Sequence, residues 1–286
     1  MEYKIIADSC CDSSVMIRED INLELVPLKI LFSHNKEYTD TLDLDIDGML
    51  DDMKYSASVN TACPSVEDYA QYMYKYDNLF VVTLGSFLSG SYNAAAAARD
   101  IVLREHPDKQ IYVFDSLNAS AGELNIVLFI NRLVSKGYSF EQIVKRTETY
   151  ISTLATFFVL EDLTNMIKNG RMSRIAEKVA TLFGIHPVLY KFDVKEIRLA
   201  AKVRGLQHAF ERIVEYIEKW TNELLEKSVD VILSHCEAEA RAELIKERIL
   251  FTCKAIHDVI VVPTSGLSAV YANRGGIIIS FQTVNY

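Results

Sequence analysis

The sequence predicts an α/β fold in two domains: an N-terminal domain with a doubly wound, mostly parallel sheet and a C-terminal α/β domain with a mixed sheet. Strand-length apolar runs alternate with amphipathic helical stretches through the first half, which favours parallel strands joined by helices. In the second half, two β-prone segments flank the turn 192–195 and predict a hairpin, so that sheet is expected to be partly antiparallel. The 286 residues, 50% of them hydrophobic, suffice for two cores. The change of pattern places the domains at 1–152 and 153–286.

Composition disfavours several classes of protein. The formal net charge of −9 argues against nucleic acid or an anionic membrane surface as the main partner. No apolar run has the length of a membrane span, so no integral membrane association is expected. The start of the chain lacks the layout of a signal peptide, and the five scattered cysteines indicate neither a disulfide framework nor a zinc site. We therefore expect a reduced, cytoplasmic protein without a metal or another cofactor.

The elements expected in the first domain follow from hydrophobic periodicity and from helix start signals. The buried-strand patterns cover residues 3–7, 23–32, 79–82 and 110–114. The helical patterns cover 45–54, 65–74 with Ser65 as the cap, the alanine-rich stretch after Asn93, 123–136, and a helix opened by a capping box at Ser139. The segment 58–65 is predicted to be a loop.

The second domain is expected to combine strands in both directions with amphipathic helices. The strand patterns cover 153–160, the hairpin arms 186–191 and 196–203, then 229–234, 255–262 and 276–281. The helical patterns cover 162–168, a stretch capped by Ser173, the long segment 205–227, 237–250 and a short helix after Ser265.

The stretch 79–103 carries the clearest indication of a binding site. A buried strand runs into a helix through a turn rich in hydroxyl groups and glycines, which are Thr83, Gly85, Ser86, Ser89, Gly90 and Ser91. Backbone N–H groups and hydroxyls converge at such a helix start, and the helix dipole favours negative charge there. The turn therefore predicts a site for phosphate, sulfate or carboxylate. The simpler alternative is that Ser89 or Ser91 only caps the helix, as serines at helix starts usually do.

A second pattern occurs twice. Asp8 and Ser9 follow the first strand, and Asp115 and Ser116 follow the strand 110–114. Both pairs are expected at the carboxyl ends of parallel strands, where open α/β sheets bind ligands. For the two aspartates we favour the simpler interpretation that each caps the next helix.

Six motifs in order, spanning nearly the whole chain, together resemble the DegV family of bacterial fatty-acid-binding proteins. Thr61-Ala62-Cys63-Pro64-Ser65 resembles the family's T-S-Q-P, and Leu88-Ser89-Gly90-Ser91-Tyr92-Asn93 resembles its L-S-G-T-Y-Q. The other matches are Asp8-Ser9, Asp115-Ser116, Asn169-Gly170-Arg171-Met172-Ser173 for the family's G-G-R-I-S, and Pro187-Val188-Leu189 followed by Val203-Arg204.

The resemblance implies that the two domains hold one long-chain fatty acid between them. The residues that match Thr61 and Ser89 bind its carboxylate in the family, and Ser86, Gly90 and Ser91 belong to the same turn. Arg171 and Arg204 match family arginines; Arg204 resembles the one that faces a partner fatty-acid kinase in members that serve one. The acyl tail is expected in an apolar tunnel, and the candidate wall residues, each of which could equally be ordinary core, are Phe157, Phe158, Leu160, Leu163, Met166, Phe183 and Ile185.

One departure from the family concerns the segment 268–276. The family has a histidine there as a further ligand of the carboxylate, in a pattern similar to S-A-H-x-G-P-G, and this chain has Val270. Tyr271, a neutral donor, or Arg274, a cation, is a candidate replacement. The departure leaves open whether a kinase partner exists, while fatty-acid binding is still expected.

The leading hypothesis is a monomeric carrier that is not itself an enzyme. The alternative is an acyl hydrolase or phosphotransferase with Ser89 as nucleophile, which would need an adjacent base. His235, directly after the strand 229–234, is the best candidate for that base. A DNA-binding regulator is opposed by the acidic charge balance and by the lack of a basic stripe.

Overall fold

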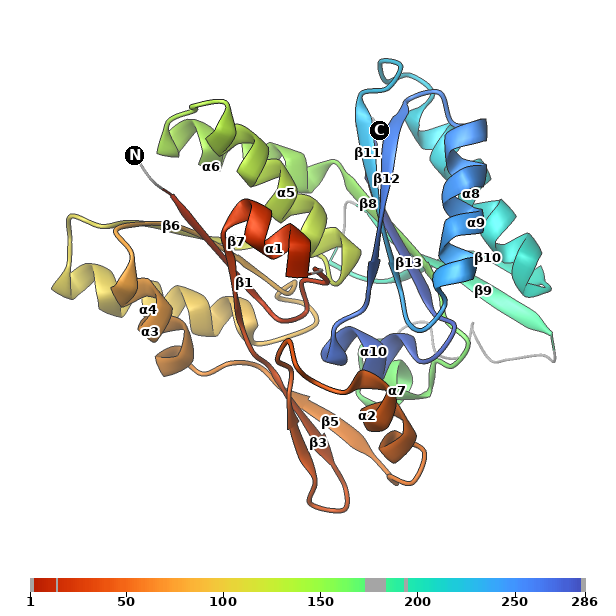
Figure 1. Ribbon diagram of the computed structural model, residues 1–286, viewed down its shortest axis with the longest axis horizontal. Helices are drawn as coiled ribbons and strands as arrows, with labels where there is room; N and C mark the ends of the chain where they lie inside the picture. Colours follow the sequence, from red (N-terminus) through yellow and green to blue (C-terminus); the bar gives the residue numbers. More distant parts are fainter. Residues whose placement is uncertain (1–2, 14, 173–183, 193–194, 284–286) are drawn as a thin grey trace. The chain divides into compact units, whose positions relative to one another are not determined.

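The computed structural model describes residues 3–13, 15–172, 184–192 and 195–283 (Figure 1). The chain forms two compact units. Unit 1 comprises Met1–Ile151 together with Ser265–Leu267, and unit 2 comprises Ser152–Thr264 together with Ser268–Tyr286. The chain thus returns to unit 1 for three residues late in the sequence, which no sequence pattern indicated.

The main sheet of unit 1 has four strands in the order β2-β1-β6-β7, and every neighbouring pair is parallel. This confirms the parallel sheet predicted for the first half of the chain. The strands are β1 (Lys4–Asp8), β2 (Leu23–Val26), β6 (Asn78–Thr83) and β7 (Gln110–Asp115). The order places β2 on one side of β1 and β6 on the other, so the connections diverge at the carboxyl ends of β1 and β6.

Helices α3 and α4 pack together on this sheet and build a core with it (Figure 1). The alanines of α4 explain the close packing, because Ala95 and Ala98 are fully buried and present only methyl groups to Tyr69, Ala70 and Met73 of α3. The helices of unit 1 are α1 (Val15–Ile21), α2 (Ile46–Met53), α3 (Val66–Lys75), α4 (Ser91–Glu105), α5 (Ala121–Ser135) and α6 (Phe140–Ser152).

A separate three-stranded antiparallel sheet, in the order β4-β3-β5, corrects two expectations. The run 23–32 is not one strand, because Pro27 lacks the N–H that a continuing ladder needs and the chain changes sheets there. The predicted loop 58–65 also contains a strand, which brings Thr61 opposite Ile30. The strands are β3 (Lys29–Phe32), β4 (Glu37–Thr39) and β5 (Val59–Ala62).

Unit 2 contains a six-stranded sheet in the order β10-β9-β8-β13-β11-β12. The hairpin of β9 and β10 is antiparallel as predicted, and only β11 and β12 pair in parallel, so the sheet is mixed. The strands are β8 (Leu154–Val159), β9 (Ile185–Lys191), β10 (Arg198–Arg204), β11 (Val229–His235), β12 (Ile256–Pro263) and β13 (Ile277–Gln282).

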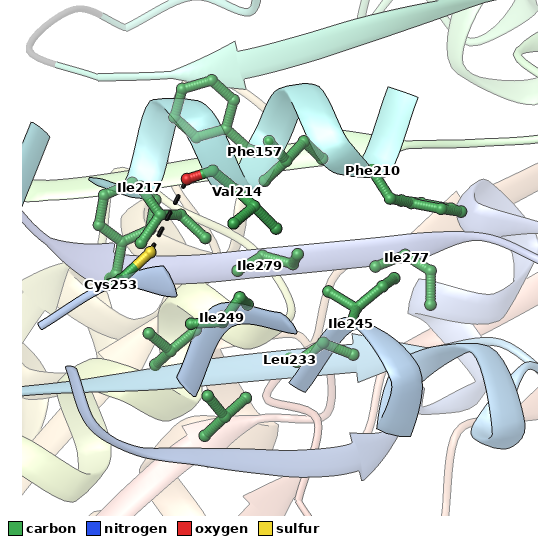
Figure 2. Packing of buried hydrophobic residues seen from close by; sticks show 14 of the residues in the cluster. Phe157, Phe210, Val214, Ile217, Leu233, Ile245, Ile249, Cys253, Ile277 and Ile279 are labelled. Atoms are coloured by element: carbon green, nitrogen blue, oxygen red, sulfur yellow. Dashed lines mark hydrogen bonds between the residues drawn. The ribbon is translucent and has the colours of Figure 1, made fainter. Parts of the chain in front are cut away.

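Helices α8 (Leu206–Thr221) and α9 (Glu239–Thr252) cover one face of this sheet. Figure 2 shows side chains of both helices meeting those of β8, β11 and β13, and the Cys253 thiol donating to the Val214 carbonyl at 3.8 Å. Two short helices complete the unit, α7 (Thr164–Lys168) and α10 (Gly266–Ala272). The helix expected after Ser173 lies outside the described residues. No helix in the described part of the chain has the length and hydropathy needed to span a bilayer.

Candidate functional site

The candidate site in unit 1 lies where the chain leaves β1 and β6. Ligands of open α/β sheets bind outside the carboxyl ends of strands at the point where connections diverge. In this sheet that point is marked by Asp8 at the end of β1 and by the turn 84–90 that joins β6 to α4. The hydroxyl-rich turn singled out from the sequence is therefore at the topologically expected position.

Asp8 links the two strand ends rather than capping a helix. Its carboxylate accepts the backbone N–H of Leu84 at 2.8 Å and that of Cys10 at 3.2 Å, and the Tyr69 hydroxyl lies 3.4 Å away. The side chain is fully buried, and burial raises the pKa of Asp8, although hydrogen bonds from Leu84, Ser91 and Cys10 lower it in part. The helix-cap interpretation of Asp8 is therefore corrected.

Asp115 holds the beginning of the turn. Its carboxylate accepts the Ser86 backbone N–H at 2.9 Å and the Ser86 hydroxyl at 2.6 Å, and it also accepts the N–H of Leu117 at 3.3 Å. The Ser86 proton is thus directed at the protein's own carboxylate. Ser86 therefore helps to fix the turn, and its expected contact with a ligand stays a prediction.

The end of the turn carries two serines in different environments. The N-cap residue of α4 is Gly90, so neither serine occupies the cap position. The Ser89 hydroxyl is half-buried, accepts the Ser91 N–H at 3.2 Å and lies 3.1 Å from the Ser91 hydroxyl. Ser91 is fully buried, and hydrogen bonding from Ser91 helps to lower the pKa of Asp8. Asp8, Ser91 and Ser89 thus form a chain of polar groups from the buried interior toward the turn surface.

The structure brings the Thr61 motif to the same turn. A Cβ atom placed on Gly90 would lie 3.1 Å from the Cys63 sulfur, so the loop after β5 touches the start of α4. Ser65 caps α3 with a full capping box, as predicted, and α3 packs on α4, which fixes this approach. The Cys63 contact was not foreseen, because nothing local in the sequence pairs the two loops.

The electrostatics of the turn favour an anion. The 15-residue helix α4 begins there, and its first-turn N–H groups have no partners inside the helix. No acidic residue occupies the first turn of α4, whereas Glu67 and Asp68 occupy that of α3. The partial positive charge at the start of α4 is therefore left uncompensated by any carboxylate of its own first turn.

In unit 2 the residues proposed around the ligand form a cluster between α7 and α10. The Arg171 guanidinium donates to the Asn169 carbonyl, and the Asn169 amide donates to the Tyr271 hydroxyl at 3.4 Å. The Asn165 amide donates to the Val270 carbonyl at 2.9 Å. Valine at 270 therefore still anchors α10 through its backbone, and Tyr271 lies in a polar neighbourhood.

The other two candidate cations of unit 2 have different surroundings. Arg274 pairs with Glu237, so its guanidinium is neutralised within the unit. Directly after it, Gly275 has φ +88°, and a Cβ there would meet Glu161 at 2.8 Å. Arg274 is thus a poorer replacement for a carboxylate ligand than Tyr271. Arg204 ends β10 with an exposed side chain.

The candidate tail-lining residues do not share one surface. Neighbours in a strand point to opposite faces, so Phe157 and Phe158 cannot line the same wall. The Phe157 ring lies 5.1 Å from those of Tyr216 and Trp220, so it packs in the core between the sheet and α8. Phe158 points to the face opposite α8. The remaining candidates are buried at Leu160, Leu163 and Met166 and partly buried at Ile185, and Phe183 lies outside the described residues.

The nucleophile and the base of the enzyme alternative belong to different units, Ser89 to unit 1 and His235 to unit 2. The hydrogen-bond partners of the Ser89 hydroxyl within the described ranges are groups of Ser91, and no base is among them. His235 Nδ1 accepts the N–H of Ala238 at 3.2 Å, and burial lowers the pKa of this imidazole. Among the residues with described positions, no cluster of histidine, cysteine or carboxylate side chains could hold a metal ion.

Comparison with known sequences decides the family. The pattern of the family described as "Uncharacterised protein, DegV family" matches residues 2–283. The chain belongs to the DegV family. A DegV domain-containing protein of Streptococcus pneumoniae is 33% identical over 286 residues, with 99% of each chain covered.

Solved DegV structures share the fold of this chain. A DegV family protein from Ruminococcus gnavus, refined with vaccenic acid, has a TM-score of 0.91 and 33% identity, covering 97% of this chain and 99% of its own. The fatty acid kinase B3 protein of Streptococcus pneumoniae, loaded with linoleic acid, has a TM-score of 0.88 and 31% identity over 99% of this chain and 100% of its own. A DegV protein from Eubacterium eligens, loaded with heptadecanoic acid, has a TM-score of 0.87 and 29% identity over 99% and 100% of the two chains.

Proposed function

We propose that this DegV protein binds a long-chain fatty acid and holds its carboxylate at the start of α4. The observation that carries the proposal is the half-buried Ser89 hydroxyl beside a helix N-terminus that has no acidic residue in its first turn. Three solved relatives, 29–33% identical over 97–99% of this chain, have fatty acids bound, which supports the choice of carboxylate over phosphate or sulfate.

In the proposed site, both hydroxyl groups and backbone N–H groups donate hydrogen bonds to the carboxylate. Ser89 donates to the carboxylate and exchanges its hydroxyl contact with Ser91 for one with the ligand. The N–H groups of the first turn of α4 and the hydroxyl of Thr61 complete the ring of donors. Gly90 admits the ligand to the backbone, since it has no side chain at this point. Ser91 and Asp8 orient Ser89 from behind.

Most of the affinity is expected from the tail. At about 0.8 kcal/mol for each buried CH₂ group, a sixteen-carbon chain gains roughly 11 kcal/mol before the costs of association are subtracted. The carboxylate contacts then select the ligand's orientation and charge. Phe158, Leu160, Leu163, Met166 and Ile185 remain the proposed wall of the tail site.

We also propose that the chain is a carrier rather than an enzyme and presents its ligand to a partner kinase. The similarity to the fatty acid kinase B3 protein supports a kinase partner, and the exposed Arg204 offers it a cation. Arg171 and Tyr271 are proposed to replace the family histidine near the carboxylate. All five cysteines are free, which fits a reducing, cytoplasmic location, and we propose that the carrier acts as a monomer.

Denaturing mass spectrometry of a solvent extract from the purified protein tests the proposal. We expect close to one fatty acid per chain, and delipidated protein should rebind palmitate or oleate. An empty extract together with failure to bind either acid would refute fatty-acid binding. Phosphorylation of the bound acid by added kinase, compared with free acid, tests the partner separately.

A further inference from the structure

The three residues Ser265–Leu267 belong to unit 1 although the chain on both sides belongs to unit 2. Ser265 directly precedes α10 and Gly266 and Leu267 are its first two residues, whereas its remaining residues from Ser268 onward belong to unit 2. Three consecutive backbone N–H groups of this return segment are bound by carboxylates of unit 1. Such groups would otherwise be left without partners at a helix start.

Asp40 accepts hydrogen bonds from two of these three N–H groups. The Gly266 N–H donates to Asp40 Oδ1 at 2.8 Å, and the Leu267 N–H donates to Oδ2 at 3.0 Å. The Ser9 hydroxyl also donates to Oδ2, at 2.8 Å, and accepts the Leu28 N–H in turn. Asp40 is only 4% exposed, so these donors replace water as its solvation. Ser9 therefore bridges the Asp40 carboxylate and the Leu28 backbone.

Asp12 binds the third. The Ser265 N–H donates to Asp12 Oδ1 at 2.9 Å, and the Ser120 hydroxyl donates to Oδ2. Asp12 is fully buried. A Cβ on Gly266 would lie 2.4 Å from Leu44 and 2.7 Å from Asp40 Oδ1, so only glycine allows this close seating of the segment.

We propose that Asp12 and Asp40 are positioning residues that form a carboxyl clasp for α10, and that uptake of a proton by Asp40 tightens its hold. The geometry supplies the reason: two carboxyl groups are buried against one short segment, and releasing the segment lets water reach both. A group that is dehydrated when the clasp is closed binds its proton more tightly in the closed state than in the open one. Protonation must then favour closure.

The surroundings of Asp40 determine the direction in which pH changes the stability of the closed clasp and the pH range over which it does so. Burial raises the pKa of Asp40 to about 6; hydrogen bonds from Leu267, Ser9 and Gly266 lower it, and the Asp12 charge raises it. Glu123 and Cys10 are titratable groups that face Asp12, and Asp8 in turn faces Glu123 and Cys10. In the open clasp the pKa of Asp40 returns toward 3.8. Closure is therefore strengthened as the pH falls from 6 to 4, by about tenfold per pH unit at most and about a hundredfold in all.

Hydrogen exchange at the Gly266 and Leu267 amides of the full chain measures the clasp without any ligand. After correction for the intrinsic exchange rate, we expect their protection to increase about a hundredfold between pH 7 and pH 4 in the wild type. Asp40→Asn, which cannot ionise, should abolish this increase. Asp45→Asn is the matched control, because Asp45 also accepts a backbone N–H, from Gly48 at 3.0 Å, but at an exposed helix start.

A second variant keeps the test decisive if Asp40→Asn does not fold. Ser9→Ala removes a hydrogen-bond donor to the ionised Asp40, which should raise the pKa of Asp40 further. The increase in amide protection should then begin at a higher pH than in the wild type. Protection that does not change with pH in the wild type, or the same pH dependence in Asp40→Asn, would overturn the clasp. The outcome is independent of fatty-acid binding, since the protein is used without ligand.

Discussion

Replacing Ser89 by alanine should weaken fatty-acid binding without unfolding the protein. The variant removes the proposed donor to the carboxylate, and a hydrogen bond to a charged group contributes about 1.5–3 kcal/mol. The dissociation constant for palmitate should therefore increase roughly 10- to 150-fold. The fold should be nearly unaffected, because among the described residues the hydroxyl forms hydrogen bonds with Ser91 only, and the Ser91 N–H can bind water instead at the half-buried turn.

Ser86→Ala is the matched control in the same turn. Its hydroxyl donates to Asp115 at 2.6 Å, so its loss should lower the free energy of unfolding while changing palmitate affinity much less than Ser89→Ala does. Displacement of a fluorescent fatty acid from delipidated protein gives both affinities, and urea unfolding gives both stabilities.

A neutral ligand separates the carboxylate contact from the tail. Wild-type protein should prefer palmitate to palmitamide, and Ser89→Ala should lose most of that preference. The reasoning is refuted if Ser86→Ala and Ser89→Ala weaken palmitate binding equally, or if Ser89→Ala keeps the full preference for the acid.

Three further outcomes are expected. Of the five cysteines, all of them described, Cys63 is the exposed one, and it touches Gly90. Native protein should therefore react with one equivalent of a thiol reagent, and bound palmitate should slow that reaction. Equal reaction rates with and without palmitate would place the carboxylate elsewhere. Phe157→Ala should lower the free energy of unfolding by about 3–5 kcal/mol and leave chain-length preference unchanged, since its ring packs against α8; a shift in preference would return it to the tail site. Burial raises the pKa of Glu123 well above its ordinary 4.5, so the folded state loses stability as the pH rises above that value. In urea unfolding, the free energy of unfolding of Glu123→Gln should therefore increase relative to that of the wild type between pH 5 and pH 8. A difference between the two proteins that does not change with pH would contradict this.

The sequence was sufficient for features that depend on local patterns. Strand-length runs and the turns after them predicted the parallel sheet, and the predicted helix cap at Ser65 was confirmed. The turn 83–91 was found because a strand, glycines and a helix start are contiguous in the chain. The different roles of Ser86 and Ser89 in this turn were not predictable, because only the tertiary contact of Ser86 with Asp115 distinguishes the two serines.

Features that depend on distant residues left no such pattern. The contact of Asp40 with Gly266 spans 226 positions, and neither residue stands in a recognisable motif. Ser120 and Glu123 have the spacing of a capping box, yet Ser120 has φ +56° and ψ −125° and gives its hydroxyl to Asp12. A tertiary contact thus overrides the local helix-start signal. The carboxyl group of Glu123 is instead fully buried beside Asp8 and Cys10.

The position of β13 has a consequence for how the chain is made. This strand is the last element of the sequence, yet it pairs with both β8 and β11 in the middle of its sheet. Until the ribosome has released it, β10, β9 and β8 have no link through the sheet to β11 and β12. Unit 2 can therefore complete this sheet only once residues 277–282 have left the ribosome, and a nascent chain halted before residue 277 would expose two unpaired strand edges, which are the kind of surface that chaperones bind.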